Sequence, residues 1–189
     1  FCKDYGIVKD EYKKILLKIK KIEKECDLII VSGGVSMGTR DYLTEIINKI
    51  GKIIFSKVSI KPGRPISFGL LKNKLPILLL PGNPVASFVT FNIFAKFLIN
   101  CMLGNKKFNL RFYKVKANFS MKKKVGREEY IRGKIFTKNN IIYADKFHTE
   151  GAGILSSVVW STGLIRLDSK TEYIKKNDNL DFLPYESFL

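Results

Sequence analysis

Residues 27–38 read DLIIVSGGVSMG, a short apolar run that leads directly into a glycine-rich loop. An apolar run of this kind is typical of a strand that is covered on both of its faces. Apolar residues recur at helical spacing before this run, over residues 10–26, which predicts a helix with Asp10 as its N-cap. They recur at the same spacing after the loop, which predicts a second helix that ends at Gly51. A buried strand between two amphipathic helices predicts an α/β fold.

The same alternation of strands and helices continues along the first half of the chain. We predict strands at residues 53–60, 66–71 and 77–80, and then a helix at residues 85–103 that is apolar on nearly every face. Such a helix is either buried all round or lies in a subunit interface. The predicted fold class of residues 1–104 is α/β, a parallel or mixed sheet with helices on both faces.

The pattern changes in the second half of the chain, which contains no long helical periodicity. Apolar and polar residues alternate at residues 114–119, a turn at residues 138–140 joins two halves of a predicted hairpin, and residues 164–167 and 180–183 are further predicted strands. We predict a small all-β C-terminal domain over residues 105–189.

Charge and hydropathy limit the partners. The 189 residues carry 34 Lys+Arg against 17 Asp+Glu, a net charge of +17. The excess is even: residues 1–104 hold 17 basic and 8 acidic side chains, residues 105–189 hold 17 and 9, and only residues 122–124 form a short basic cluster. A nucleic-acid interface concentrates basic residues on one surface, so a nucleic-acid partner is unlikely, and an RNA-binding module is an alternative that rests on charge alone. Apolar runs such as residues 28–31 are too short to span a membrane, so we expect no membrane association.

Cysteine and histidine exclude several kinds of site. The three cysteines are widely spaced and form no CxxC pair, which excludes zinc ribbons and thioredoxin-like motifs. An odd number of cysteines without a disulfide framework suits a reducing compartment, and we expect the protein to be cytoplasmic. His148 is the only histidine, so a histidine-rich metal site is excluded and we interpret His148 as an ordinary loop residue.

Two loops, at residues 32–38 and 81–84, each connect a predicted buried strand to a helix. In an open α/β sheet such loops line the crevice at the carboxyl ends of the strands. Glycine lets the backbone approach a ligand closely, and the helix that follows offers free N–H groups. The two loops therefore indicate a site for an anion such as phosphate, unless their glycines only permit tight turns.

Three charged residues could serve such a site. Asp41 follows the first loop, where it either stabilises the helix dipole or binds a hard cation such as Mg²⁺. Lys61 and Arg64 stand in a loop stiffened by two prolines, which either clamps an anion or is a solvated basic turn.

The motifs resemble those of the molybdopterin molybdenumtransferase family, of the MoeA and gephyrin E-domain type. Three motifs of the first half occur in the family's order and at compatible spacings: SGGVSMG at 32–38 with DY at 41–42, KPGRP at 61–65, and LPGNPV at 80–85. The second half resembles the family's C-terminal domain at GR (126–127), YIR (130–132) and GAGILSS (151–157).

This resemblance implies a function and a site. Members of the family insert molybdate into adenylylated molybdopterin, require Mg²⁺, release AMP and complete their cleft across a homodimer. Asp41 would be the catalytic acidic residue that positions Mg²⁺ or molybdate. The substrate-binding residues implied by the matching motifs are Ser32, Gly33, Gly34, Ser36, Lys61, Pro62, Gly63, Arg64, Pro81, Gly82, Asn83, Pro84 and, in the β domain, Arg132.

The chain departs from the family's pattern in three respects. Thr39 stands where an acidic residue is common, and Ala152 stands where a serine is usual. The family is also much longer, so we expect this chain to be its C-terminal portion, with an N-terminally truncated molybdopterin-binding domain over residues 1–104, and to be incomplete as an enzyme.

Two other functions stay open. The first is a molybdopterin adenylyltransferase-like nucleotide-binding domain, which shares the α/β fold and a similar Ser/Thr-Gly-Gly loop. The KPGRP loop and the β domain argue against it. The second is a non-catalytic dimeric scaffold, which the apolar helix at residues 85–103 suggests.

Overall fold

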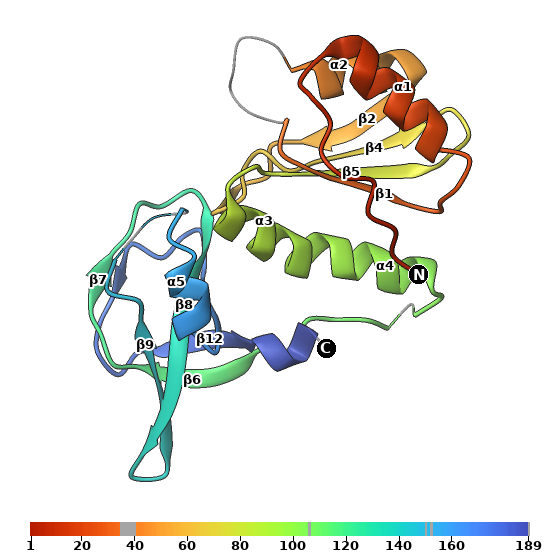
Figure 1. The fold of residues 1–189 in the computed structure, drawn as a ribbon. Helices are drawn as coiled ribbons and strands as arrows, with labels where there is room; N and C mark the ends of the chain where they lie inside the picture. Colours follow the sequence, from red (N-terminus) through yellow and green to blue (C-terminus); the bar gives the residue numbers. More distant parts are fainter. Residues whose placement is uncertain (35–40, 106, 150, 152, 189) are drawn as a thin grey trace. The chain divides into compact units, whose positions relative to one another are not determined.

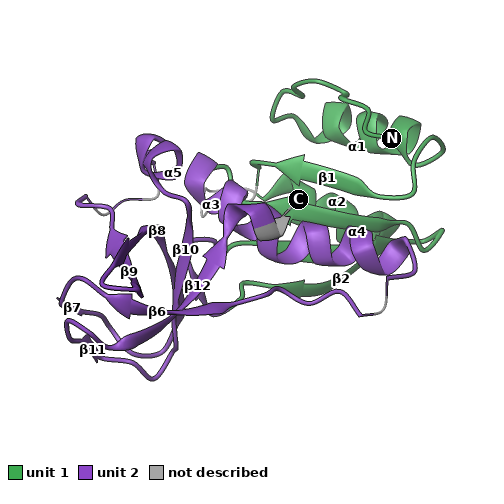
Figure 2. Ribbon diagram, turned by 90° about the horizontal axis from the view of Figure 1, so that it is seen from below, with its two compact units in different colours: residues 1–58, 65–82 green, residues 59–64, 83–189 purple. Residues whose placement is uncertain are grey.

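A computed structural model describes residues 1–34, 41–105, 107–149, 151 and 153–188. Two compact units make up the chain (Figure 2): the first comprises Phe1–Val58 and Pro65–Gly82, and the second comprises Ser59–Arg64 and Asn83–Leu189. The predicted domain boundary near residue 105 stays a prediction. The compact units divide elsewhere, because the helix after residue 83 and the loop at residues 59–64 both belong with the β-rich unit.

The first unit contains a four-stranded mixed sheet. Its strands lie in the order β1 (Ile29–Ser32), β5 (Pro76–Leu80), β4 (Ser67–Leu71) and β2 (Gly51–Ser56). Strands β1 and β5 are parallel, whereas β4 pairs antiparallel with both β5 and β2. The strands predicted at residues 28–31, 66–71 and 77–80 are thus confirmed to within a residue, and the sheet is mixed.

Two helices, α1 (Tyr12–Ile22) and α2 (Tyr42–Ile50), cover the same face of this sheet (Figure 1). The prediction that helices cover both faces of the sheet is not confirmed within this unit. The core contains apolar residues at helical spacing from both helices together with strand residues: Ile15, Ile19, Ile22, Leu43, Ile46, Ile47, Ile77 and Leu79. Both helices were predicted, but Asp10 is not the N-cap of α1. Glu11 holds that position, without a side-chain capping bond.

Strand β1 is less buried than its sequence predicts. Ile29 is buried, but Ile30 is 37% exposed and Ser32 is exposed. The reason is its place in the sheet, because β1 is an edge strand that pairs only with β5 among the described strands. The prediction of a strand covered on both faces is therefore wrong for β1, whereas β5 has four buried residues in succession and fits it.

The second unit is built on a closed, barrel-like sheet. Five strands follow one another round the ring: β10 (Gly163–Leu167), β12 (Asn179–Pro184), β6 (Tyr113–Ala117), β9 (Ile141–Lys146) and β8 (Glu128–Lys138). Pairing of β8 with β10 closes the ring, and the short strand β3 (Ile60–Lys61) adds to β8 in parallel. Strands β7 (Met121–Lys122) and β11 (Tyr173–Ile174) form a separate ribbon, and two short helices, α5 (Ser156–Trp160) and η2 (Tyr185–Phe188), complete the unit.

The predicted hairpin is confirmed as β8 and β9. Asn139 and Asn140 at its turn have φ values of 49° and 59°, the left-handed conformation that a tight two-residue turn requires and that asparagine tolerates. Phe136 pairs with Tyr143 across the hairpin, and their rings stack with centroids 5.8 Å apart. Such cross-strand aromatic pairs stabilise a two-stranded ribbon.

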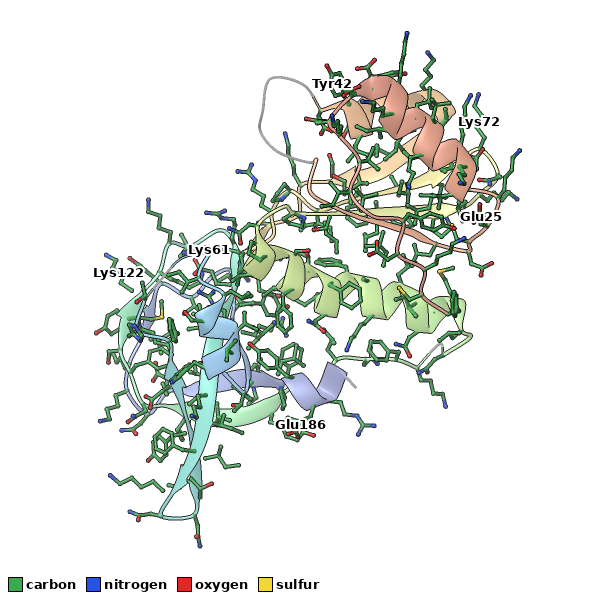
Figure 3. The ribbon with its side chains drawn as sticks, viewed as in Figure 1. Glu25, Tyr42, Lys61, Lys72, Lys122 and Glu186 are labelled. Atoms are coloured by element: carbon green, nitrogen blue, oxygen red, sulfur yellow. The ribbon has the colours of Figure 1, made fainter. Side chains whose placement is uncertain are left out.

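The short basic cluster at residues 122–124 is not a uniform charged surface. Lys122, labelled in Figure 3, has a side chain that is 75% exposed. Lys123 is 5% exposed, and its ammonium donates hydrogen bonds to the backbone oxygens of Lys124, Arg127 and Thr171 at 3.2, 3.1 and 3.0 Å. Lys123 therefore ties its own turn, at residues 123–127, to the distant segment at Thr171.

A long helical stretch begins the main part of the second unit. It comprises α3 (Pro84–Thr90), a π-helical turn η1 (Phe91–Ala95) and α4 (Lys96–Met102). The predicted helix is confirmed, but burial on every face is wrong for α4. None of the residues of α4 is buried, and Phe97 is 48% exposed.

This stretch also corrects the statement, made from the sequence, that the apolar segments are too short to span a membrane. Pro84–Met102 has 19 residues and a mean hydropathy of 1.6 in its most apolar window, which is long and apolar enough to cross a membrane by length and composition alone. That statement rested on uninterrupted apolar runs, which do not reveal this helical stretch. A helix packed inside a soluble protein passes the same test, so this length alone indicates neither location.

Candidate functional site

The described beginnings of the two predicted ligand loops, residues 32–34 and 81–82, lie side by side in the first unit at the ends of parallel strands. Ser32 of β1 pairs with Leu80 of β5, and the next residue, Gly33, donates its N–H to the Leu80 oxygen at 3.2 Å. Gly82 continues from the neighbouring strand. Parallel pairing places the carboxyl ends of both strands at one edge, as an open α/β sheet requires for a ligand crevice.

Glycine is required where these loops touch. A side chain on Gly82 would place its Cβ 3.3 Å from the Cα of Gly33, tighter than ordinary van der Waals contact. Gly33 and Gly34 have φ values of 88° and 72°, a region that residues with a side chain rarely adopt. The loops are therefore held close by their backbones, and Gly34, which is exposed, leaves its backbone accessible to a ligand.

Asp41 is the N-cap of α2 rather than a residue of its first turn. Its Oδ1 accepts a hydrogen bond from the Thr44 N–H at 3.0 Å, and its Oδ2 accepts one from the Thr44 hydroxyl at 2.8 Å. Both carboxylate oxygens thus stabilise the helix terminus. A carboxylate oxygen has a second lone pair, so capping leaves capacity to ligate a cation.

Within the described part of the chain, Asp41 does not belong to a cluster of metal-ligating side chains. No group of three or more His, Cys, Asp or Glu side chains with metal-binding geometry occurs there. A single carboxylate fits Mg²⁺ only when substrate phosphates and water supply the remaining oxygens, which is the usual arrangement at phosphate-handling sites.

The remaining residues of the PGNP motif begin the second unit. Asn83 caps α3 by accepting a hydrogen bond from the Ala86 N–H at 3.3 Å, and Pro84 occupies the first helical position. Both were predicted from their residue types. Pro81, the last buried residue of the first unit before this helix, precedes Gly82.

The second unit contains a pocket of about 90 Å³. Three of its lining residues, Lys61, Pro62 and Arg132, were predicted as site residues from motifs that lie about 70 positions apart. The pairing of β3 with β8 brings these motifs together. The pocket is lined by Lys61, Pro62, Met121, Glu129, Tyr130, Ile131, Arg132, Lys146, Phe147, Thr149 and Gly151.

Two of the pocket's charged side chains are held by neighbours. The Lys61 ammonium lies 3.2 Å from the Glu129 carboxylate, whose side chain is only 6% exposed. Arg132 is 8% exposed, and its guanidinium donates to the Ser157 hydroxyl at 3.0 Å and to the Gly151 carbonyl at 3.1 Å. Fixing a guanidinium in this way lowers the entropy that it loses when it binds an anion.

Tyr130 forms one wall of the pocket and is itself ordered by a carboxylate. Its hydroxyl donates to Glu128, which also lies 3.1 Å from the guanidinium of Arg166. Burial, and then the hydrogen bond to Glu128, raise the pKa of the Tyr130 hydroxyl far above its ordinary value. Tyr130 is therefore a neutral wall residue at physiological pH.

Gly63 and Arg64 complete the KPGRP loop. Gly63 is buried with a φ of 114°, and an added Cβ would lie 2.3 Å from the Thr90 methyl, so the loop packs tightly against α3. The Lys61–Pro62 peptide bond is cis. Arg64 is exposed and is not among the residues that line the pocket. The structure therefore brings Lys61 and Pro62 to Arg132, and leaves Arg64 outside.

Sequence reasoning missed several residues of this pocket. Glu129 and Lys146 line it, and Ser157 holds Arg132 from behind. Glu129 adjoins the YIR motif at residues 130–132, so the strand register could have indicated it, whereas nothing in the sequence pattern distinguishes Lys146 from other lysines. Ser36, Thr39 and Ala152 lie outside the described residues.

Comparison with known proteins identifies the family. Residues 2–100 match the family described as a probable molybdopterin binding domain, and residues 114–185 match the MoeA C-terminal region, domain IV. The chain belongs to the molybdopterin molybdenumtransferase family, of the MoeA and gephyrin E-domain type.

Relatives of this molybdopterin molybdenumtransferase family member cover nearly the whole of its length. It is 33% identical to the putative molybdopterin biosynthesis protein of Methanocaldococcus jannaschii over 180 residues. This alignment covers 95% of this chain and 42% of that protein. It is 30% identical over 188 residues to a molybdopterin molybdenumtransferase of Haemophilus influenzae, which is 98% of this chain and 46% of that protein. The chain therefore spans less than half the length of these relatives.

Solved structures show the same fold. Two structures of the molybdopterin biosynthesis MoeA protein from Pyrococcus horikoshii match with TM-scores of 0.75 and 0.70. Both matches cover 95% of this chain. The first covers 42% of the solved chain at 19% sequence identity, and the second covers 41% at 24%.

Proposed function

We propose that the chain serves the Mg²⁺-dependent insertion of molybdate into adenylylated molybdopterin, with release of AMP. The observation that carries this proposal is the pocket of the second unit, which gathers Lys61, Arg132 and Lys146 around a volume of about 90 Å³. Sites for drug-sized ligands are about 300–1,000 Å³, so this pocket suits a small anion rather than a nucleotide. Molybdate is a small tetrahedral oxyanion with two negative charges.

The residues of the pocket would bind and orient this oxyanion. Arg132 is buried, and its guanidinium donates hydrogen bonds to Ser157 and Gly151, which fix its position. Arginine offers several N–H donors in a planar fork that suits oxyanions. Lys61 and Lys146 add two ammonium groups, and that of Lys61 is paired with Glu129. Their role is to hold molybdate until the pterin dithiolate displaces its oxygens.

The first unit would bind the nucleotide part of the second substrate. The adjoining loops that end β1 and β5 present glycine backbone at the sheet edge, and α2 begins a few residues later. Free backbone N–H groups at such places bind phosphate. Ser32, Gly33, Gly34 and Ser36 would contact the diphosphate, with Pro81 and Gly82 forming the opposite side.

Asp41 would hold the cation that this step requires. Mg²⁺ bound there would neutralise the charge that develops when the phosphoanhydride bond is cleaved and AMP leaves. The donor set fits this role, because Asp41 supplies one carboxylate and the diphosphate supplies further oxygens. Its bonds to Thr44 fix the carboxylate at the start of α2 before the substrate arrives.

Equilibrium binding of adenylylated molybdopterin, with and without Mg²⁺, tests the assignment. Asp41→Asn keeps a good helix cap but removes the negative charge, so it should abolish the Mg²⁺-dependent part of the affinity without unfolding α2. Asp27→Asn is the matched control, because Asp27 is exposed and precedes β1 at the strand end opposite the loops. Mg²⁺-dependent binding that is equal in both variants would refute the role of Asp41.

The adenylyltransferase-like alternative makes a different prediction. Incubation with ATP and molybdopterin should give no adenylylated product if the chain acts in molybdate insertion. Formation of adenylylated molybdopterin from ATP would instead favour the alternative.

We also propose that the protein is a cytoplasmic homodimer that uses the exposed part of its apolar helical stretch. Phe97 is 48% exposed and Leu103 is 80% exposed, although both are large apolar residues. All three cysteines are free, as suits a reducing compartment. Sedimentation should show a dimer that Phe97→Glu dissociates; a wild-type monomer would contradict this and would also count against the scaffold alternative.

A further inference from the structure

One carboxylate lies among the cations of the pocket. Glu129 lines it together with Lys61, Arg132 and Lys146. We propose that Glu129 is a specificity-determining residue, which lowers the positive charge of the pocket by one and so sets how strongly the pocket prefers a dianion to a monoanion of the same shape. This inference rests on the proposed function, in which the pocket binds an oxyanion.

The fold places Glu129 there and holds it. Lys61 of β3 and Glu129 of β8 are direct partners in the parallel pairing of the two strands. Their charged groups lie 3.2 Å apart, and the carboxylate is 6% exposed whereas Lys61 is 48% exposed. A buried carboxylate of this kind needs a paired cation, because an unpaired buried charge is strongly destabilising. Glu129 is therefore the fixed member of the pair, and Lys61 is the member that can move.

The pair alters the charge that an incoming anion meets. The described side chains that line the pocket carry three positive charges and one negative charge. Within that set, Glu129 offsets the charge of Lys61, so the lining side chains carry a net charge of two positive units. Because electrostatic energy scales with the charge of the ligand, Glu129 weakens the binding of a dianion about twice as much, in free energy, as that of a monoanion.

Molybdate and perrhenate are suitable probes. Both are tetrahedral oxyanions of closely similar size, and they differ by one negative charge. A unit charge about 6 Å away changes the affinity for a monoanion about threefold and for a dianion about tenfold, even at the dielectric constant of water. The ratio of the two affinities therefore reports the charge of the pocket, whereas the absolute affinities also report lost contacts.

Isothermal titration of the full 189-residue chain at low salt makes the comparison. Glu129→Gln should raise the affinity for perrhenate about threefold and that for molybdate about tenfold. The double variant Glu129→Gln/Lys61→Gln restores the wild-type charge and should restore the wild-type ratio, whatever its absolute affinities. Glu172→Gln is the matched control, because Glu172 pairs with Lys122 where both side chains are exposed.

The outcomes separate this inference from the proposed function. If the wild type binds molybdate and Glu129→Gln leaves the ratio unchanged, the role of Glu129 is refuted and the oxyanion pocket stands. Weaker molybdate binding by Glu129→Gln, with an unchanged ratio, would mean that Glu129 only positions Lys61, which also overturns the inference. If the wild type binds neither anion, the oxyanion pocket and the inference both fail.

Discussion

Replacing Lys123 with methionine tests the unexpected burial of a lysine in the second unit. The change keeps the length of the side chain and removes an ammonium that donates to three backbone carbonyls at 3.0–3.2 Å. A hydrogen bond from a charged group contributes about 1.5–3 kcal/mol, and the cost of burying the ammonium offsets part of the gain from three such bonds. Methionine leaves the carbonyl oxygens without this donor, at about 1–3 kcal/mol for each one that stays buried, so we expect a loss of about 3 kcal/mol.

Urea denaturation followed by tryptophan fluorescence measures this loss. Trp160 is the only tryptophan and belongs to the second unit, so its signal reports on that unit. Lys122→Met is the matched control: it removes the same charge from the neighbouring position, where the side chain is 75% exposed, and should change the free energy of unfolding by no more than about 0.5 kcal/mol. Equal effects of the two substitutions would refute the reasoning.

Two further predictions concern the second unit. Burial raises the pKa of the Tyr185 hydroxyl above 10.0, so the stability that this group contributes is present below pH 10 and is lost as the pH rises through the raised value. Tyr185→Phe should flatten the alkaline loss of stability, and an unchanged slope of unfolding free energy against pH would contradict this. Gly63→Ala and Gly126→Ala both force alanine into a positive φ, which costs about 1–2 kcal/mol. Gly63→Ala should cost about 1–3 kcal/mol more by urea denaturation, because its Cβ meets the Thr90 methyl while that of Gly126 meets nothing within 4 Å; equal losses would refute the packing argument.

The sequence was sufficient to predict most of the elements, because their signals are local. Asn139 and Asn140 marked a hairpin turn, and Asn83 with Pro84 marked the start of a helix. The neighbouring positions of the chain segments after β1 and β5 were also predicted, since parallel strands bring their carboxyl ends together, whereas their role in binding a ligand stays a prediction.

Burial was harder to predict, because it depends on tertiary neighbours. Residues 28–31 form an apolar run like that of β5, yet β1 lies at a sheet edge and exposes Ile30. Lys123 stands between two other lysines, yet its side chain is buried. Its ammonium donates to the carbonyls of Lys124 and Arg127 in the same turn and to that of Thr171, which is distant in the sequence. Composition alone contains no information on either arrangement.

The residues of the candidate site also differ in how well the sequence predicted them. Motif resemblance indicated Lys61 and Arg132, and the pairing of β3 with β8 places both in one pocket. Glu129 could have been inferred from its place beside the YIR motif, whereas nothing in the sequence pattern distinguishes Lys146 from the other lysines. The assigned roles of these residues stay proposals until an anion is located among them.

The most direct test of the account is to locate molybdenum by its anomalous X-ray scattering in crystals of the protein grown with molybdate. The account predicts an anomalous peak in the pocket lined by Lys61, Arg132 and Lys146, and loss of that peak in Arg132→Met crystals. Molybdenum bound elsewhere on the chain, with this pocket empty at saturating molybdate, would contradict the proposal that the pocket is the oxyanion site.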